Sequence, residues 1–280
     1  MGTLQRSIAL ARAAWGVLRQ DKELAILPIL SFAAWLVIAA TFALPIATIA
    51  GGTNEGDSWT ANPLVWVIAF AGYVVLTYVM IFFNAAIVCG ADERLQGGDP
   101  TLGSALRGAR ERAGVLLPWA VLSATVSLVL RALEERLGLI GRIVVGFVGL
   151  AWTLVTFLVV PILVVEQLSV GAAVKRSAEL FKHTWGENVV TNGGVWLLGT
   201  LAAVAGLIVV FPLLVLGGAA TALGIVIGLA WIAVVSVVVT TLSGIVSIAL
   251  YRYAVDGDVP GFGTDQLREA FRPRKRGLSI

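Results

Sequence analysis

Long, uninterrupted apolar runs constrain this chain more than any other feature of its sequence. The first begins near Leu24 and continues for about 27 residues, and similar runs recur along the chain. An apolar run of roughly 20 residues carries a helix across the ~30 Å hydrocarbon core of a bilayer. Apolar residues make up 58% of the chain and charged residues 13%, against roughly 45–50% and 25% in soluble domains. The sequence therefore predicts an integral membrane protein.

Six of these runs are long enough to be transmembrane helices. We expect an all-α, polytopic transmembrane helix bundle, because barrel strands would alternate apolar and polar residues. The expected spans are residues 24–50, 63–90, 114–132, 141–165, 189–216 and 219–251. The third is the shortest, and the stretch GGAAT between the last two predicts a tight turn. Together they form a single transmembrane domain (1–255), followed by a basic tail with a short amphipathic helix (256–280).

Lysine and arginine are distributed unequally around these spans. Of the 20 such residues, all but three fall on one side of the predicted bundle. The exceptions are Arg131, Arg136 and Arg142, between the third and fourth spans. Because basic loops stay in the cytoplasm, we expect a multi-pass protein of the inner (plasma) membrane with both termini cytoplasmic. The bias toward Ala, Val, Gly and Arg is typical of a GC-rich bacterial genome.

A basic segment of helical periodicity recurs beside the spans. Such segments cover about residues 3–22, 101–112 and 169–185, so the chain shows a threefold-repeated pattern of one amphipathic helix and two spans. In the first segment one apolar stripe is formed by Leu4, Ile8, Ala11, Trp15 and Leu18. Two placements stay open: the helices lie in the cytoplasmic membrane interface, or they pack on the ends of the bundle.

The stretch PILVVEQLSVGAAVKRSAELFKHTW carries a family resemblance. It matches a pattern formed by Pro161, Glu166, Ala173, Arg176, Ser177 and Leu180. This pattern resembles the membrane domain attached to some glycerophosphodiester phosphodiesterases. The N-terminal stretch AAWGVLRQDKELAILPILS together with LFKHTWGENVV is more similar still to an uncharacterised prokaryotic six-span family of unknown function. The resemblance implies a six-helix membrane fold and no catalytic residue.

Few polar groups lie inside the predicted spans, and each is a candidate contact. Asn84 predicts a hydrogen bond to another helix, or alternatively a pore or substrate contact. Glu166 is expected to cap the next helix or to pair with Lys175 or Arg176. Asn188 or Asn192 could cap the first turn of the fifth span. We also expect small-residue pairs, Ala202 with Gly206 and Gly224 with Gly228, to permit close helix contact.

The basic segments supply a second set of candidates, which would contact lipid headgroups or the interface. These candidates are Arg107, Arg110, Lys175, Arg176, Lys182, His183 and Trp185. His183 is the only histidine, and we interpret it as an interfacial residue where a surface helix turns into the membrane. The alternative for His183 is a pH-sensitive contact to a lipid phosphate.

No catalytic, cofactor or metal motif accompanies these candidates. The sequence has one cysteine and one histidine, and it lacks HExxH, GxSxG and Walker A patterns. We therefore expect a non-enzymatic membrane protein without a cofactor, which interacts with anionic lipid or organises the membrane through its basic helices. The alternative is a transporter or channel component for a small or lipid-like substrate. Expected partners are membrane lipids and a second copy or another membrane protein, but no nucleic acid.

Overall fold

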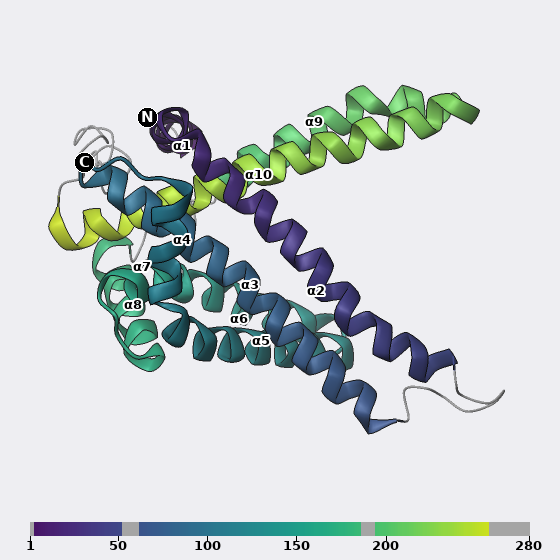
Figure 1. Cartoon of the computed structure of the whole chain (residues 1–280), viewed down its shortest axis with the longest axis horizontal. Coiled ribbons are helices and arrows are strands. Elements are labelled where there is room, and N and C mark those ends of the chain that lie inside the picture. Colours follow the sequence, from purple (N-terminus) through teal and green to yellow (C-terminus); the bar gives the residue numbers. More distant parts are fainter. Residues whose placement is uncertain (1–2, 52–61, 186–193, 258–280) are drawn as a thin grey trace, which may run out of the picture. The chain divides into compact units, whose positions relative to one another are not determined.

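All regular secondary structure is helical over the residues that the structure describes, namely 3–51, 62–185 and 194–257 of a computed structural model (Figure 1). This confirms the predicted all-α class. The helices are α1 (Thr3–Gln20), the 3-10 helix η1 (Lys22–Ala25), α2 (Ile26–Gly51), α3 (Pro63–Leu95), α4 (Leu102–Glu111), α5 (Ala113–Arg136), α6 (Leu139–Thr156), α7 (Val159–Val165), α8 (Val170–Trp185), α9 (Gly194–Val215) and α10 (Gly218–Asp256).

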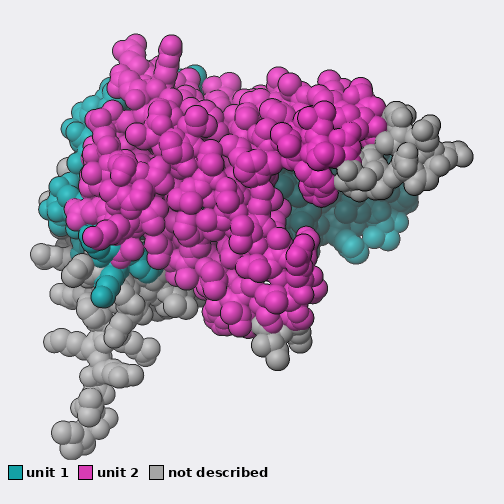
Figure 2. Space-filling view, turned by 90° about the horizontal axis from the view of Figure 1, so that it is seen from below, with its two compact units in different colours: residues 1–26, 90–102, 179–280 teal, residues 27–89, 103–178 magenta. Residues whose placement is uncertain are grey.

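These helices divide between two compact units, which Figure 2 colours separately. Unit 1 comprises residues 1–26, 90–102 and 179–280, and it contains α1, η1, α9 and α10. Unit 2 comprises residues 27–89 and 103–178, and it contains α5, α6, α7 and most of α2 and α3.

Five helical segments of the described chain are long and apolar enough to cross a membrane. They are Lys22–Ala50, Pro63–Leu95, Ala113–Arg136, Gly141–Val165 and Gly218–Asp256. Their surfaces are rich in exposed apolar side chains, as lipid-facing helices require. The chain is thus a multi-pass membrane protein. The expected fifth span coincides largely with α9, whose apolar part Gly199–Val215 is shorter, so the sixth crossing stays a prediction.

Two predicted boundaries differ from the observed helices. Helix α5 continues to Arg136, beyond the expected end at residue 132, because Leu, Glu and Arg are good helix formers. Helix α10 already begins at Gly218, so most of the expected turn GGAAT is helical. The reversal uses Gly217 and Gly218 instead, whose φ angles of 80° and 57° suit glycine.

Pro161 breaks the predicted fourth span into two helices. Helix α6 ends at Thr156 and α7 starts at Val159. Proline has no N–H to donate, and its ring clashes with the carbonyl four residues earlier, which belongs to Phe157. The chain therefore leaves the helix at Phe157 and Leu158. The short α7 that follows is almost wholly buried.

The small-residue pairs join α9 to α10 within unit 1, where the two helices run side by side (Figure 1). A side chain at Gly224 would meet Leu213 at 3.0 Å, so this glycine permits the close approach. The indole of Trp231, on α10, lies over Gly206 of α9 and donates a hydrogen bond to the Ala202 carbonyl at 3.0 Å. Both small-residue pairs therefore lie in the contact between α9 and α10.

Candidate functional site

The polar residues of unit 2 gather where α7 ends and α8 begins. The Arg176 Nε donates to Glu166 Oε1 at 3.3 Å, which is one of the two pairings expected for Glu166. From the start of α5, Arg112 Nε donates to the Val164 carbonyl at 2.9 Å. That carbonyl is in the last turn of α7, where helical partners are missing. These contacts tie α5, α7 and α8 together in unit 2.

Ser177 completes this arrangement by satisfying the broken span. Its side chain is fully buried, and its hydroxyl donates to the Val155 carbonyl near the end of α6. A buried carbonyl left without a partner would cost about 1–3 kcal/mol. The motif residues Ala173 and Leu180 are also buried. Most residues of the motif therefore have a visible structural role around the Pro161 break.

Helices α4 and α8 each separate buried small residues from exposed basic ones. On α4, Ala105 and Ala109 have no exposed surface, whereas Arg107 and Arg110 are exposed. On α8, Ala173 and Ser177 are buried, and Lys175 and Lys182 are exposed. Arg176 is only half-buried because it faces Glu166. The basic candidates on these helices are thus accessible, with Arg176 partly committed to an ion pair.

The strongest polar contacts of unit 1 centre on Arg94, near the end of α3. Its Nε and Nη2 donate to both carboxylate oxygens of Asp21, which lies between α1 and η1. The same Nη2 donates to Asp99 at 2.6 Å. The Asp21 side chain is 4% exposed and that of Asp99 is 92% exposed. Arg94 therefore bridges one buried and one exposed carboxylate.

A second ion pair joins the end of α3 to the end of α10. The Arg252 Nε and Nη2 donate to Asp92 at 2.7 and 2.9 Å, and Nη1 donates to Asp256 at 3.4 Å. Nearby, Glu23 accepts the first N–H of α4, from Leu102, at 2.8 Å. These contacts, which we call the unit 1 ion-pair cluster, bring the segment from Asp21 into η1, the ends of α3 and α10 and the start of α4 to one place.

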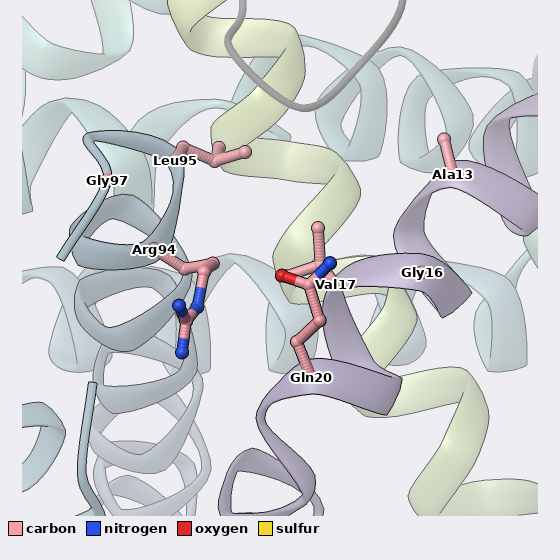
Figure 3. A pocket seen from close by; sticks show the side chains of 7 residues that line it. All are labelled: Ala13, Gly16, Val17, Gln20, Arg94, Leu95 and Gly97. Carbon is pink, nitrogen blue, oxygen red and sulfur yellow. The ribbon is translucent and has the colours of Figure 1, made fainter. Parts of the chain in front are cut away.

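A cavity of about 340 Å³ lies beside this cluster, between α1 and the end of α3 (Figure 3). It is lined by Ala13, Gly16, Val17, Gln20, Arg94, Leu95 and Gly97. The Gln20 side chain extends from α1 into this space, with Arg94 and Leu95 on the opposite side. Apart from atoms of the adjoining residues, no heavy atom of the described chain lies within 4 Å of where a Cβ on Gly16 or Gly97 would stand. The two glycines therefore border open space.

Asn84 is half-buried on α3, and its amide makes no hydrogen bond with the described residues. His183 and Trp185 belong to the last turn of α8, but their side chains lie outside the described part. Asn188, Asn192 and the tail from residue 258 also lie outside the described residues. The proposed roles of these residues stay predictions.

Only part of the apolar stripe expected on α1 packs within unit 1. Leu18 is 6% exposed, but Trp15 is 43% exposed and shares its exposed side with Arg12 and Arg19. The buried side of α1 instead uses Ala14 and Val17, because this helix packs against both α9 and α10. Periodicity alone had no information about that second neighbour.

Sequence reasoning did not find the unit 1 ion-pair cluster. Asp21, Asp92 and Arg94 are close to span ends, but only Arg94 entered the predictions, as one of the basic residues on the predicted cytoplasmic side. The available signal was the proximity of acids to bases at three predicted span ends, in RQDKE, ADER and YRYAVD. Which acid meets which base depends on how the helices pack.

Comparison with known proteins places most of this chain in one family. The model described as a family of unknown function, DUF6159, matches residues 63–262. The match begins at the start of α3 and runs past the end of α10. No match was found among curated proteins. The family description assigns no activity, so the function must be argued from the residues.

Proposed function

Because the chain belongs to the DUF6159 family of unknown function, we propose its role from its own residues: a non-enzymatic membrane protein that binds anionic lipid headgroups through basic interfacial helices. The family match and the apolar helices support its multi-pass membrane character. The relation in pattern to the membrane domain of glycerophosphodiester phosphodiesterases belongs to this proposal too. It rests on the segment from Pro161 to Leu180.

The two-sided exposure of α4 carries the proposal. Ala105 and Ala109 are fully buried, so this face is held by protein, while Arg107 and Arg110 are left exposed beside apolar spans. A basic residue close to an anionic membrane surface gains about 1 kcal/mol. Helix α8 offers Lys175 and Lys182 in the same way, and α1 offers Arg12 and Arg19 with the exposed Trp15. Tryptophan favours headgroup depth.

A non-enzymatic role is supported by how the charged groups are used. In the described residues, Glu166, Asp21 and Asp92 accept hydrogen bonds from arginines, and Glu23 accepts one from a helix N–H. Ser177 donates to a backbone carbonyl. These side chains therefore hold helices together, which gives each a structural reason to be present.

Lipid retention in nanodiscs tests the proposal. The full chain is reconstituted in nanodiscs with equal amounts of phosphatidylcholine and phosphatidylglycerol. The lipids that stay bound to the protein after its release from the nanodisc are counted by native mass spectrometry. We expect enrichment of phosphatidylglycerol, reduced about fivefold or more by the double variant Arg107→Gln/Arg110→Gln. The matched control is Arg131→Gln/Arg136→Gln, two exposed arginines on the other predicted side. Equal retention of both lipids by the wild type would refute the proposal.

The second candidate, a transporter or channel component, is favoured by Asn84. A half-buried amide without a hydrogen bond to the described chain is costly in an apolar setting, at about 1–3 kcal/mol. Such a group gains by contacting water, substrate or a second copy. If Asn84 lines a transport pathway, Asn84→Leu will lower solute flux into proteoliposomes without lowering the thermal stability of the protein. If the Asn84→Leu protein transports every solute that the wild type transports at an unchanged rate, Asn84 does not line a transport pathway.

A further inference from the structure

The cavity beside Arg94 lies at the end of α3, beyond the apolar part of this helix. Helix α3 has 33 residues and is therefore about 50 Å long at 1.5 Å per residue, whereas the hydrocarbon core is only ~30 Å thick. Its last turn, which carries Arg94 and Leu95, lies beyond the apolar run that ends near residue 90. A volume of about 340 Å³ is within the range of small-molecule sites, roughly 300–1,000 Å³.

The polar groups of this cavity retain unused hydrogen-bonding capacity. Arg94 uses its Nε and Nη2 for Asp21 and Asp99, so its Nη1 has no partner among the described residues. The Gln20 amide, which lines the same space, likewise makes no hydrogen bond within the described chain. A ligand here would meet N–H donors from two directions. This favours a group with several acceptor oxygens.

The charge at Arg94 selects among such groups. One guanidinium faces two carboxylates, Asp21 and Asp99, so the immediate surroundings carry an excess of negative charge. A purely anionic headgroup would be repelled by that excess, whereas a group that adds its own cation would be attracted. Asp99 is 92% exposed and follows Gly97, which lines the cavity. A cation at the rim can therefore reach its carboxylate.

We propose that this cavity binds an aminoethyl phosphate group, the headgroup of ethanolamine phospholipids. The phosphate accepts hydrogen bonds from Arg94 Nη1 and the Gln20 amide, and the ammonium pairs with Asp99. Gly16 and Gly97 leave room for the group, because nothing in the described chain occupies the space in front of them. This site uses none of the basic residues of α4 and α8, so it does not depend on the anionic-lipid role proposed above.

The test uses full-length protein in nanodiscs that contain equal amounts of phosphatidylethanolamine, phosphatidylcholine and phosphatidylglycerol. Native mass spectrometry is expected to find phosphatidylethanolamine enriched among the retained lipids. Gly16→Leu fills the cavity from α1 and should reduce that enrichment about tenfold. Asp99→Asn removes an exposed ion pair and should reduce it about threefold. Gly114→Leu on α5, another glycine facing open space, is the matched control and should leave it unchanged.

A soluble arm identifies the source of the group. Calorimetry with phosphoethanolamine on detergent-solubilised protein should show weak or no binding if the acyl chains contribute, and strong binding without lipid enrichment would assign the site to a free phosphate ester. The absence of both phosphatidylethanolamine enrichment and phosphoethanolamine binding would overturn the proposal. So would undiminished enrichment in a Gly16→Leu protein of wild-type thermal stability. The phosphatidylglycerol signal reports separately on Arg107 and Arg110.

Discussion

Asp21 and Arg94, 73 positions apart, form a two-point ion pair in which the carboxylate is buried and the guanidinium partly exposed. Asp21 follows the last residue of α1, and Arg94 precedes the last residue of α3. The pair therefore fixes the junction between α1 and η1 against the end of α3. Two parallel N–H···O bonds also set the orientation of the arginine.

Removing the buried carboxylate should be costly. We expect Asp21→Ala to lower the free energy of unfolding by about 2–3 kcal/mol, because Arg94 loses its two-point partner in a partly desolvated place. Equilibrium unfolding in mixed SDS and mild detergent measures the change. Glu135→Ala, an exposed acid on α5, should change stability by less than about 0.5 kcal/mol. Equal effects of the two substitutions would contradict a special role for Asp21.

Gly206 should tolerate no side chain while Trp231 is present. A Cβ there would stand 1.9 Å from the Trp231 Nε1, so Gly206→Ala must displace the indole and break its bond to Ala202. We expect a loss of about 1–3 kcal/mol, seen as a lower melting temperature. In a Trp231→Leu background the same alanine should be neutral or stabilising, since alanine is more favourable than glycine inside a helix by about 1 kcal/mol. An equal loss in both backgrounds would argue against this contact.

Lysine should not replace Arg252. Two of its nitrogens bind the two oxygens of Asp92, and an ammonium is a point charge that cannot reproduce this fork. We expect Arg252→Lys to destabilise the protein by about 1–2 kcal/mol. The same substitution at the exposed Arg131 should be nearly silent in the same unfolding titration. A double-mutant cycle with Asp92→Asn should return a coupling of about 1 kcal/mol or more.

Glu23 should govern how often α4 frays at its start. Its carboxylate accepts the Leu102 N–H, and loss of such a cap costs about 0.5–2 kcal/mol. Hydrogen exchange at Leu102 should therefore accelerate about fivefold in Glu23→Ala. Glu23→Gln keeps an acceptor oxygen and should accelerate it less. Identical exchange in wild type and Glu23→Ala would show that the cap does not limit opening.

Much of the architecture follows from local pattern. Apolar runs mark the five segments that are long enough to cross a membrane, because a lipid-exposed helix must be apolar over roughly 20 residues whatever its neighbours are. Pro161 marks the break in the fourth span, since proline acts on its own helix. The Glu166–Arg176 pair was among the expected pairings because both residues belong to one short segment.

The sequence by itself thus determined the helical class and the membrane character, and it included the Glu166–Arg176 pair among the expected pairings. Tertiary structure alone decided that Asp21 meets Arg94, that Asp92 meets Arg252 across 160 positions, and that Trp15 faces outward while Ala14 is buried. The physical reason is the range along the chain over which each sequence signal acts. Hydropathy and helical period act within one turn or one span, whereas these pairings depend on which helix ends pack together, and several partners of either charge were available to each residue.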